Sequence, residues 1–455
     1  MAYEKLCCKD GDILCASDLE HIEDGIVAAE KAHVEIQNKI AAVAGSSDIV
    51  CYAEGDVIGV SDSADRELRG LKVFGKTTQN GIPTPQAPVP LESIGKSVTV
   101  KVSGKNLLDQ RSSNWQSKEI TNGITYTYVR DSDGNLLYIN ANGPNTTTSN
   151  SHSKKAFTTL PAGTYTVTGC PSGYGSDISL RVGKGASGAY MEVDQGNGYT
   201  FTLTEETIIS INLMVGAGKA VSNVKFYPMI RLASETDATY EPYVRRDITT
   251  LTPSGLPGIP VTSGGNYTDS NGKQWICDEV DFEKGVYVQR VYRQTYTGSS
   301  SEAWGKSSTT AKDRFYTKYM VSNTMKPCLC NMAVFVPAPV YENGKCFVTF
   351  NSSSNAYYFE IIAGDYGTFA NTLEWRRYIE EHPLEVLYVL AEENYIPLYE
   401  IDPDVLAQYA TLHTNYPNTT VLNDAGAGLG VKYVADAKNY IDNKFNELAA
   451  ALVNS

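Results

Sequence analysis

The sequence predicts a mainly β protein: two β-sandwich or jelly-roll-like domains, flanked by N-terminal and C-terminal trimeric α-helical coiled coils. Composition is the first observation, because 38 glycines and 30 tyrosines in 455 residues are typical of short strands joined by turns. The second is the alternation of apolar residues with threonine and serine, which indicates half-buried antiparallel strands. The third is a helical spacing of apolar residues near both ends of the chain. The length allows two to four domains.

The segment 18–45 carries an unbroken heptad pattern, which predicts a coiled coil. Ser17 and Glu20 form a capping box at its start, and Gly45 ends it. Apolar residues follow a 3-4 spacing that fills core positions a and d. The predicted trimerisation residues of this helix are Leu19, Ile22, Ile26, Ala29, His33, Ile36, Ile40 and Val43.

This helix needs partner helices. Burial of its six Ile, Leu and Val side chains contributes about 9–18 kcal/mol, whereas ordering about 26 residues costs about 1–2 kcal/mol each. Isoleucine at both core positions favours three or four helices, so we predict a parallel homotrimer. His33 would bring three imidazoles to the axis, as a register-setting polar layer or, alternatively, as a site for an ion or water.

A second apolar stripe, over residues 431–453, predicts a C-terminal helix bundle. The step from Val434 to Phe445 is eleven residues, which favours a nearly straight bundle. The glycine-rich stretch from Asp424 to Gly430 is predicted to be a hinge. The contact residues expected in this bundle are Val434, Ala437, Ile441, Phe445, Leu448 and Leu452.

Strand patterns and turn residues set the domain boundaries between these helices. Residues 371–382 fit one helix, with Thr372 as its cap and Pro383 as its stop. The predicted divisions are a β- and Pro-rich connector at 46–104, a jelly roll at 105–245, a connector at 246–284, a second β-rich domain at 285–425 and the C-terminal bundle at 426–455.

The charge balance restricts the partners. The chain has 38 basic and 52 acidic residues, a net charge of −14, so we expect no nucleic-acid partner. Strongly anionic polymers are disfavoured as well, unless a basic patch or a bound cation intervenes. The sequence has no apolar run of about 18 residues, so we expect no membrane insertion.

The sequence offers no catalytic or metal-binding motif, so we expect no enzyme activity, no cofactor and no metal. Gly-x-Ser-x-Gly, Walker and His-Glu-x-x-His motifs do not occur. Nine scattered cysteines without a Cys-x-x-Cys pair indicate reduced thiols in a protein made in a cytosol. Asp131 opens a segment like a calcium loop, but Asn142 stands where the loop needs Glu, so we expect a plain turn there and another at 269–272.

Exposed aromatic rings are the side chains on which sugars stack. Tyr126 and Tyr128 share one face of a predicted strand, and the other three rings lie in predicted loops. For each ring, core or interface packing is the alternative. The candidate glycan-binding residues are Trp115, Tyr126, Tyr128, Tyr174 and Trp304.

Several strings between residues 70 and 455 resemble tail proteins of bacteriophages and prophages that infect Gram-positive gut bacteria. They are Leu71-Lys-Val-Phe-Gly-Lys-Thr-Thr-Gln-Asn-Gly81, Gly104-Lys-Asn-Leu-Leu108, Pro228-Met-Ile-Arg-Leu232, Thr239-Tyr-Glu-Pro-Tyr243, Gly255-Leu-Pro-Gly-Ile-Pro-Val261, Gln274-Trp-Ile-Cys-Asp-Glu279 and Tyr440-Ile-Asp-Asn-Lys-Phe445.

This resemblance implies a tail fibre, receptor-binding or baseplate protein in the virion, made in the host cytoplasm. It implies a homotrimer that attaches to other tail or baseplate proteins through residues 1–17 and recognises host surface polysaccharide. The resemblance carries no catalytic residues. A purely structural baseplate adaptor and a polysaccharide depolymerase are the alternatives.

Overall fold

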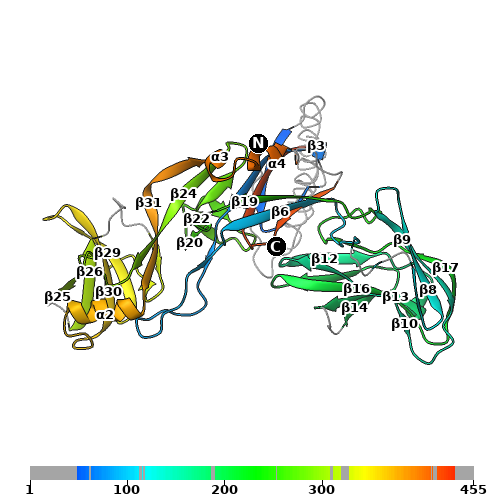
Figure 1. Ribbon diagram of the computed structural model, residues 1–455, viewed down its shortest axis with the longest axis horizontal. Coiled ribbons are helices and arrows are strands. Elements are labelled where there is room, and N and C mark those ends of the chain that lie inside the picture. Colours follow the sequence, from blue (N-terminus) through cyan, green and yellow to red (C-terminus); the bar gives the residue numbers. More distant parts are fainter. Residues whose placement is uncertain are drawn as a thin grey trace, which may run out of the picture. The chain divides into compact units, whose positions relative to one another are not determined.

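The computed structural model describes residues 49–60, 63–111, 115, 118–185, 190–252, 254–307, 311–318, 327–410, 412 and 418–435. The predicted coiled coil at 18–45 and the part of the predicted bundle after residue 435 lie outside these ranges. The described residues are mainly β, as predicted, with three α-helices among them (Figure 1). Residues Tyr52–Ser61 and Arg66–Tyr433 form one unit, whose three main hydrophobic cores are described in turn.

The first core, here the discontinuous core, is built from three separate parts of the chain. Its buried residues fall within 58–102, 248–287 and 398–431. A seven-stranded and a four-stranded sheet supply its strands. In sheet order these are β1 (Ile49–Gly55), β33 (Gly428–Ala435), β3 (Ser63–Phe74), β23 (Glu279–Asp281), β24 (Val286–Tyr296), β31 (Leu384–Pro397) and β27 (Cys328–Cys330), and then β19 (Arg245–Leu251), β6 (Ser97–Ser103), β32 (Thr419–Asn423) and β2 (Ile58–Val60).

The two predicted connectors therefore supply strands to a core. Val98, Val100 and Val102 alternate with Ser97, Thr99 and Lys101, and the three valines are buried in β6. Short helices α3 (Leu398–Ile401) and α4 (Val405–Ala410) add Leu398 and Val405 to this core. Small sheets accompany it: β4 (Thr77–Thr78) with β5 (Glu92–Ser93), and β20 (Gly258–Val261), β22 (Gln274–Cys277) and β21 (Tyr267–Thr268).

The second core, the 107–230 core, lies within the predicted jelly-roll segment except for Leu422, which β32 contributes. Three curled sheets contribute buried side chains to it. Their strands, in sheet order, are β17 (Ala220–Phe226), β9 (Leu136–Pro144), β8 (Ile124–Arg130) and β7 (Lys118–Thr121); β15 (Tyr199–Leu203), β12 (Gly163–Thr168) and β18 (Met229–Leu232); and β10 (Ser151–His152), β16 (Thr207–Val215), β13 (Ile178–Lys184) and β14 (Tyr190–Asp194), with β11 (Ala156–Leu160) also paired to β16.

The third core, the 296–388 core, forms around the predicted helix. Helix α2 (Thr372–Glu381) stacks Trp375 on Phe315, with ring centroids 4.9 Å apart. Its cap is Asn371 and not Thr372, because the Asn371 side chain accepts hydrogen bonds from the amides of Leu373 and Glu374. The sheet of this core has the order β25 (Gly305–Ser307), β26 (Lys312–Lys318), β30 (Ala356–Asp365), β29 (Lys345–Asn351) and β28 (Val334–Phe335).

The prediction of a helix from residue 431 is wrong for its first turn. Residues 428–435 form strand β33, and Leu429 and Val431 alternate into the discontinuous core. Val434 is a buried strand residue at this point. Strand pairing here overrides the helical spacing, which begins on Val431, Tyr433 and Val434, β-branched and aromatic residues that favour a strand.

The predicted hinge at 424–430 is a tight turn that leads from β32 into β33. The side-chain oxygen of Asn423 accepts hydrogen bonds from the amides of Ala425 (3.0 Å) and Ala427 (2.9 Å). Both turns predicted at 131–135 and 269–272 are confirmed, because the Asp131 and Asp269 carboxylates accept backbone amides across them. Among the described residues, no group of three or more His, Cys, Asp or Glu side chains is placed to hold a metal ion.

One buried carboxylate, Asp278, holds a bulge in β24. The register between β24 and β31 shifts between Gln289 and Val291, which leaves Arg290 without a partner residue on β31. The amides of Arg290 and Val291 donate to Asp278 Oδ1 at 2.7 Å, and the Tyr287 hydroxyl donates to Oδ2 at 2.6 Å. Burial raises the pKa of Asp278 to about 6, although these hydrogen bonds act in the opposite direction.

The pKa of Asp278 makes a testable contribution to stability. A carboxyl group whose pKa is higher in the folded than in the unfolded chain stabilises most below pH 4, and the stabilisation is lost as pH rises through 6. An asparagine does not titrate. The unfolding free energy of the unaltered protein minus that of Asp278→Asn should therefore fall by about 2.4 kcal/mol between pH 4 and pH 7, measured by urea denaturation. A difference that rises with pH would contradict this assignment.

A second prediction concerns the close approach of backbones beside Asp278. A Cβ at Gly75 would lie 2.4 Å from the Pro257 carbonyl oxygen and 2.5 Å from that of Leu256. Gly75→Ala should destabilise the protein by about 1–3 kcal/mol, since backbone atoms would have to move. The control is Gly95→Ala, because nothing lies within 4 Å of a Cβ there. Thermal unfolding that shifts equally in both variants would refute the argument.

Candidate functional site

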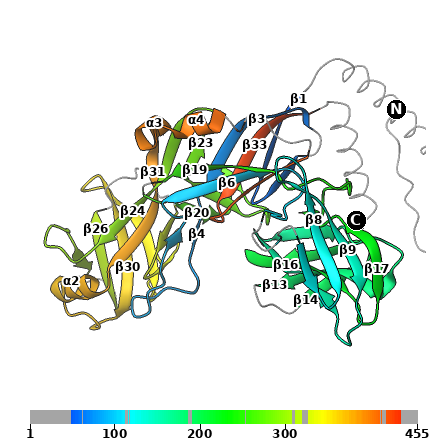
Figure 2. The ribbon, with the colours of Figure 1, turned by 45° about the vertical axis from the view of Figure 1, so that its right-hand side comes forward.

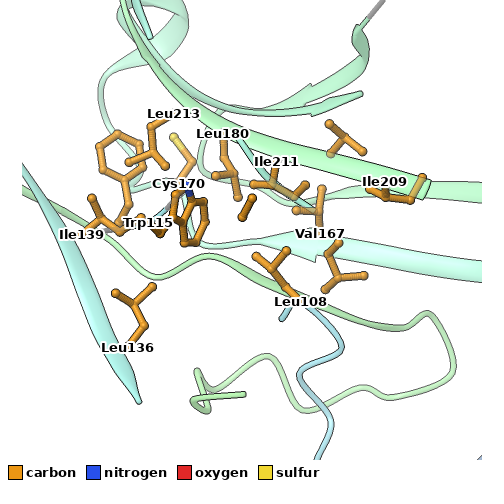
Figure 3. Packing of buried hydrophobic residues seen from close by; sticks show 14 of the residues in the cluster. Leu108, Trp115, Leu136, Ile139, Val167, Cys170, Leu180, Ile209, Ile211 and Leu213 are labelled. Atoms are coloured by element: carbon orange, nitrogen blue, oxygen red, sulfur yellow. The ribbon is translucent and has the colours of Figure 1, made fainter. Parts of the chain in front are cut away.

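Four of the five aromatic residues predicted to bind sugar are core residues. Trp115, Tyr126 and Tyr128 lie in the 107–230 core and are at most 4% exposed, and Trp304 is 6% exposed in the 296–388 core. Figure 3 shows Trp115 enclosed by Leu108, Ile139, Leu180 and their neighbours. A ring covered on both faces by its own chain offers no surface for stacking, so packing, the alternative reading, describes these four side chains.

Tyr174 is the exposed member of the set. It precedes the short 3₁₀ helix at Gly175–Asp177, and 42% of its surface is accessible. None of the other four predicted rings makes a described contact with it, so the five residues do not form one site in the described structure.

A different surface lies on the same domain, on the outward side of β16. Ile209, Ile211 and Leu213 point into the 107–230 core. Because side chains alternate along a strand, Ile208, Ser210, Asn212 and Met214 point to the opposite side. Figure 2 shows β16 running beside β13 in this sheet.

Strand register brings polar residues of the neighbouring strands to this side. Arg181 of β13 pairs with Asn212, and Ser179 pairs with Met214. On the other edge, His152 of β10 pairs with Met214, and Phe157 of β11 pairs with Ser210. We call this surface the β16 outer face and define it by seven residues: His152, Phe157, Ser179, Arg181, Ser210, Asn212 and Met214.

The floor of the β16 outer face is buried and polar. Ser179 and Ser210 are each 1% exposed, and Asn212 is 2% exposed. The hydroxyls of Ser179 and Ser210 have no hydrogen-bond partner among the described residues. A buried hydroxyl without a partner costs about 1–3 kcal/mol. Two such hydroxyls on one face therefore leave hydrogen-bonding capacity unused.

Cationic groups surround this floor. The imidazole of His152 lies 3.4 Å from the Asn212 amide nitrogen, measured from Nδ1 to Nδ2. Burial lowers the pKa of His152, and the positive charges of Arg181 and Lys155 lower it further. His152 is therefore neutral at pH 7, in a local field that is positive.

The β16 outer face continues into a cavity of about 420 Å³. Phe157 belongs to the face and lines the cavity, and Ile208, which is 48% exposed, also lines the cavity. The cavity also has Tyr243 in its wall, with the guanidinium of Arg245 6.0 Å from the centre of the tyrosine ring. The remaining lining residues are Lys101, Ser103, Leu107, Asp109, Thr158, Thr159, Leu160 and Leu422.

The outward side of β30 in the third core is a weaker candidate. It carries Tyr358 and the buried carboxylate of Glu360, and Tyr316 of the neighbouring β26 lies beside Tyr358 with ring centroids 5.8 Å apart. That carboxylate already receives hydrogen bonds from Arg314 and Thr349. The Glu360 carboxylate is therefore satisfied, whereas the Ser179 and Ser210 hydroxyls of the β16 outer face have no partner among the described residues.

Sequence reasoning placed the strand but not the site. The alternation in Ile208-Ile-Ser-Ile-Asn-Leu213 does predict that Ser210 and Asn212 share the side opposite the core. Which strands flank β16, and hence the presence of Arg181 and Ser179, depends on pairings between distant segments.

Comparison with protein-family models, with curated proteins and with solved structures found no match to this chain. Among the described helices, none is both long and apolar enough to cross a membrane.

The unpartnered hydroxyls predict a gain of stability on their removal. Replacing Ser179 and Ser210 together by alanine should raise the unfolding free energy by about 2–6 kcal/mol, because the penalty of two buried hydroxyls disappears. Ser222→Ala, on an exposed position of β17, is the matched control and should change stability by less than about 0.5 kcal/mol. A loss of stability in the double variant, measured by denaturant titration, would mean that these hydroxyls are satisfied in solution.

Proposed function

We propose that this chain is the subunit of a homotrimeric tail fibre or receptor-binding protein of a bacteriophage, and that its β16 outer face binds host surface polysaccharide. The observation that carries the binding proposal is the pair of buried, unpartnered hydroxyls at Ser179 and Ser210. Proteins seldom retain such groups unless a ligand or water satisfies them.

The chemistry of the face suits a saccharide. Sugar hydroxyls both donate and accept hydrogen bonds, and they can pair with the two serines and with Asn212. The C–H surface of a pyranose can rest on Phe157, which is half-buried on the same face. Because the side chains stand on paired strands, they need little ordering when a ligand binds.

Trimerisation gives a reason why a modest site suffices. A millimolar dissociation constant corresponds to about −4.1 kcal/mol. Linked copies can raise the overall avidity by about 10²–10⁴. The heptad stripe at 18–45 is the segment that would hold three copies in register, and residues 1–17 are the proposed attachment to the tail or baseplate.

The assembly is tested by the mass of the purified full chain in solution. Light scattering should give about three times the chain mass of 49.6 kDa. Ile26→Asp places a charge in the predicted seam and should reduce the mass toward that of a monomer. Lys31→Asp, at the solvent-facing heptad position f, is the control and should remain trimeric. A folded, unaltered protein at 49.6 kDa at micromolar concentration would disprove the trimer.

Host attachment is tested with the same preparations. The trimer should bind intact host cells, and the double Ser179→Ala, Ser210→Ala variant should bind at least tenfold more weakly while remaining folded. Ser222→Ala should bind as the unaltered protein does. Retention by other tail proteins without any binding to cells would favour a structural adaptor, and release of reducing ends from purified polysaccharide would favour a depolymerase.

A further inference from the structure

We infer that the outward side of the sheet formed by β25, β26, β30 and β29 holds a second saccharide site, which takes one pyranose ring. The ring rests on two tyrosines, and two of its neighbouring hydroxyls accept hydrogen bonds from an arginine. We call this surface the tyrosine corner and define it by Gly305, Arg314, Tyr316, Tyr358 and Glu360. The site goes beyond the proposed function, because it lies over the 296–388 core and is separate from the β16 outer face.

Strand alternation and register bring the side chains of the tyrosine corner together. Phe315 of β26 and Phe359 of β30 point into the 296–388 core. Because side chains alternate along a strand, Tyr316, Tyr358 and Glu360 point to the opposite side. Tyr316 and Glu360 are register partners, and Figure 1 shows β26 beside β30 in this sheet. The two tyrosines and the carboxylate therefore belong to one surface.

A glycine lets the Tyr316 ring lie directly on the sheet. Tyr316 pairs with Gly305 of β25, where a Cβ would lie 2.5 Å from Tyr316 Cε2 and 2.6 Å from its Oη. The ring therefore fills the space that a side chain at residue 305 would take. The Tyr358 ring meets it at 78°, with centroids 5.8 Å apart. Both tyrosines are half-buried, so part of each ring is accessible, and the corner between them offers apolar surface to the C–H groups of a pyranose.

Arg314 is held in place beside the two rings and keeps part of its donor capacity. Its Nε donates to the carboxylate of Glu360, which also accepts a hydrogen bond from Thr349. The guanidinium carbon lies 5.3 Å from the centre of the Tyr341 ring. Nη1 and Nη2 of Arg314 donate no hydrogen bond within the described part of the chain, and 19% of the side chain is accessible. The internal contacts therefore fix the guanidinium through Nε and leave its two terminal nitrogens for a ligand.

The combination of rings and guanidinium selects the class of ligand. A guanidinium presents its N–H donors in a rigid planar fork, which two neighbouring hydroxyl oxygens can accept together. A planar aromatic ligand would match the tyrosine rings but not the fork. A small carboxylate or phosphate would match the fork but not the rings. A pyranose carries an apolar C–H surface and adjacent hydroxyls in one rigid ring, so it matches both. Because the side chains of the corner are already held by the sheet, they need little ordering on binding.

The test uses the methyl glycosides of glucose, galactose and mannose as probes of the full-length protein. Saturation-transfer difference NMR at about 5 mM glycoside suits a weak single site. The protein carries Ser179→Ala with Ser210→Ala, so that the β16 outer face does not contribute. At least one glycoside should give a signal that rises to saturation. Acetate, which fits the fork alone, should leave that signal unchanged, and its displacement of the glycoside would overturn the site as described.

Variants locate the binding on the molecule. Tyr316→Ala removes one wall of the corner and should weaken binding by about fivefold or more, whereas Tyr316→Phe keeps the ring and should bind as before. Arg314→Lys keeps a positive charge beside Glu360 but loses the fork, and should weaken binding by about fivefold. Tyr399→Ala is the matched control, because Tyr399 of α3 is 59% exposed and makes no described ring contact. Where Tyr316→Ala fails to fold, Tyr358→Ala takes its place.

The outcomes separate this inference from the proposed function. If none of the three glycosides binds, the tyrosine corner is rejected, while attachment of the unaltered protein to host cells would leave the proposed function standing. Glycoside binding that Tyr316→Ala and Arg314→Lys leave unchanged would place the site elsewhere and reject it here. Glycoside binding that both variants weaken, in a protein that does not attach to host cells, would support the corner and overturn the proposed function.

Discussion

Much of the described fold depends on the hydrogen bonds that the Arg290 and Val291 amides of the β24 bulge donate to Asp278. Strands β24 and β31 are paired over most of their length, and they supply side chains to two different cores. Tyr287 lies in the discontinuous core, whereas Tyr296 and Leu384 lie in the 296–388 core. A bulge bends and twists a strand pair, so the carboxylate that pairs its two amides also fixes the path of these strands between the cores. The same residue ties in further segments through its backbone, which bonds to Gly75 and Pro257.

Other buried polar groups, like Asp278, have hydrogen-bond partners, which makes the two unpartnered serines of the β16 outer face unusual. Asp194 accepts the amides of Cys170, Gly196 and Gly198. Asn106 receives two amides and donates to the Glu241 carbonyl. Some buried polar atoms elsewhere do lack a described partner, among them the indole nitrogen of Trp375. The two serines differ because they stand on adjacent strands, on the side of the sheet that faces away from the core.

The sequence was sufficient for the features that depend on neighbours along the chain. Alternation of apolar and polar residues predicted strands such as β8 and β16, and helix α2 was predicted from Thr372 and Pro383, although its cap is Asn371. The predictions that failed concern pairings between segments that are distant in the sequence. Leu71 and Val98 belong to one core with Val421 and Leu429, and no local pattern connects residues more than 300 positions apart. For the same reason residues 431–435 pair as a strand despite a helical spacing.

The candidate site shows the same division. The sequence predicted that Tyr126 and Tyr128 share one face of a strand, which the structure confirms, but it did not predict that this face is the inner one. Alternation along β16 likewise predicted that Ser210 lies on the side opposite the core. Its flanking cations come from β13 and from the break between β10 and β11, which are separated from β16 by about 25 to 60 residues and are joined to it only by tertiary pairing.

The acidity of the whole chain and the cationic character of one face are compatible because of the distance over which charge acts. At physiological ionic strength the screening length is about 8 Å. A ligand bound at the proposed site would therefore respond mainly to the charges of Arg181 and Lys155, and little to distant carboxylates. The burial of that floor reinforces the effect, because ion pairs excluded from water are screened less than exposed ones. Net charge consequently describes how the protein behaves in solution at long range, whereas the charged groups close to the face would decide which ligand the proposed site binds.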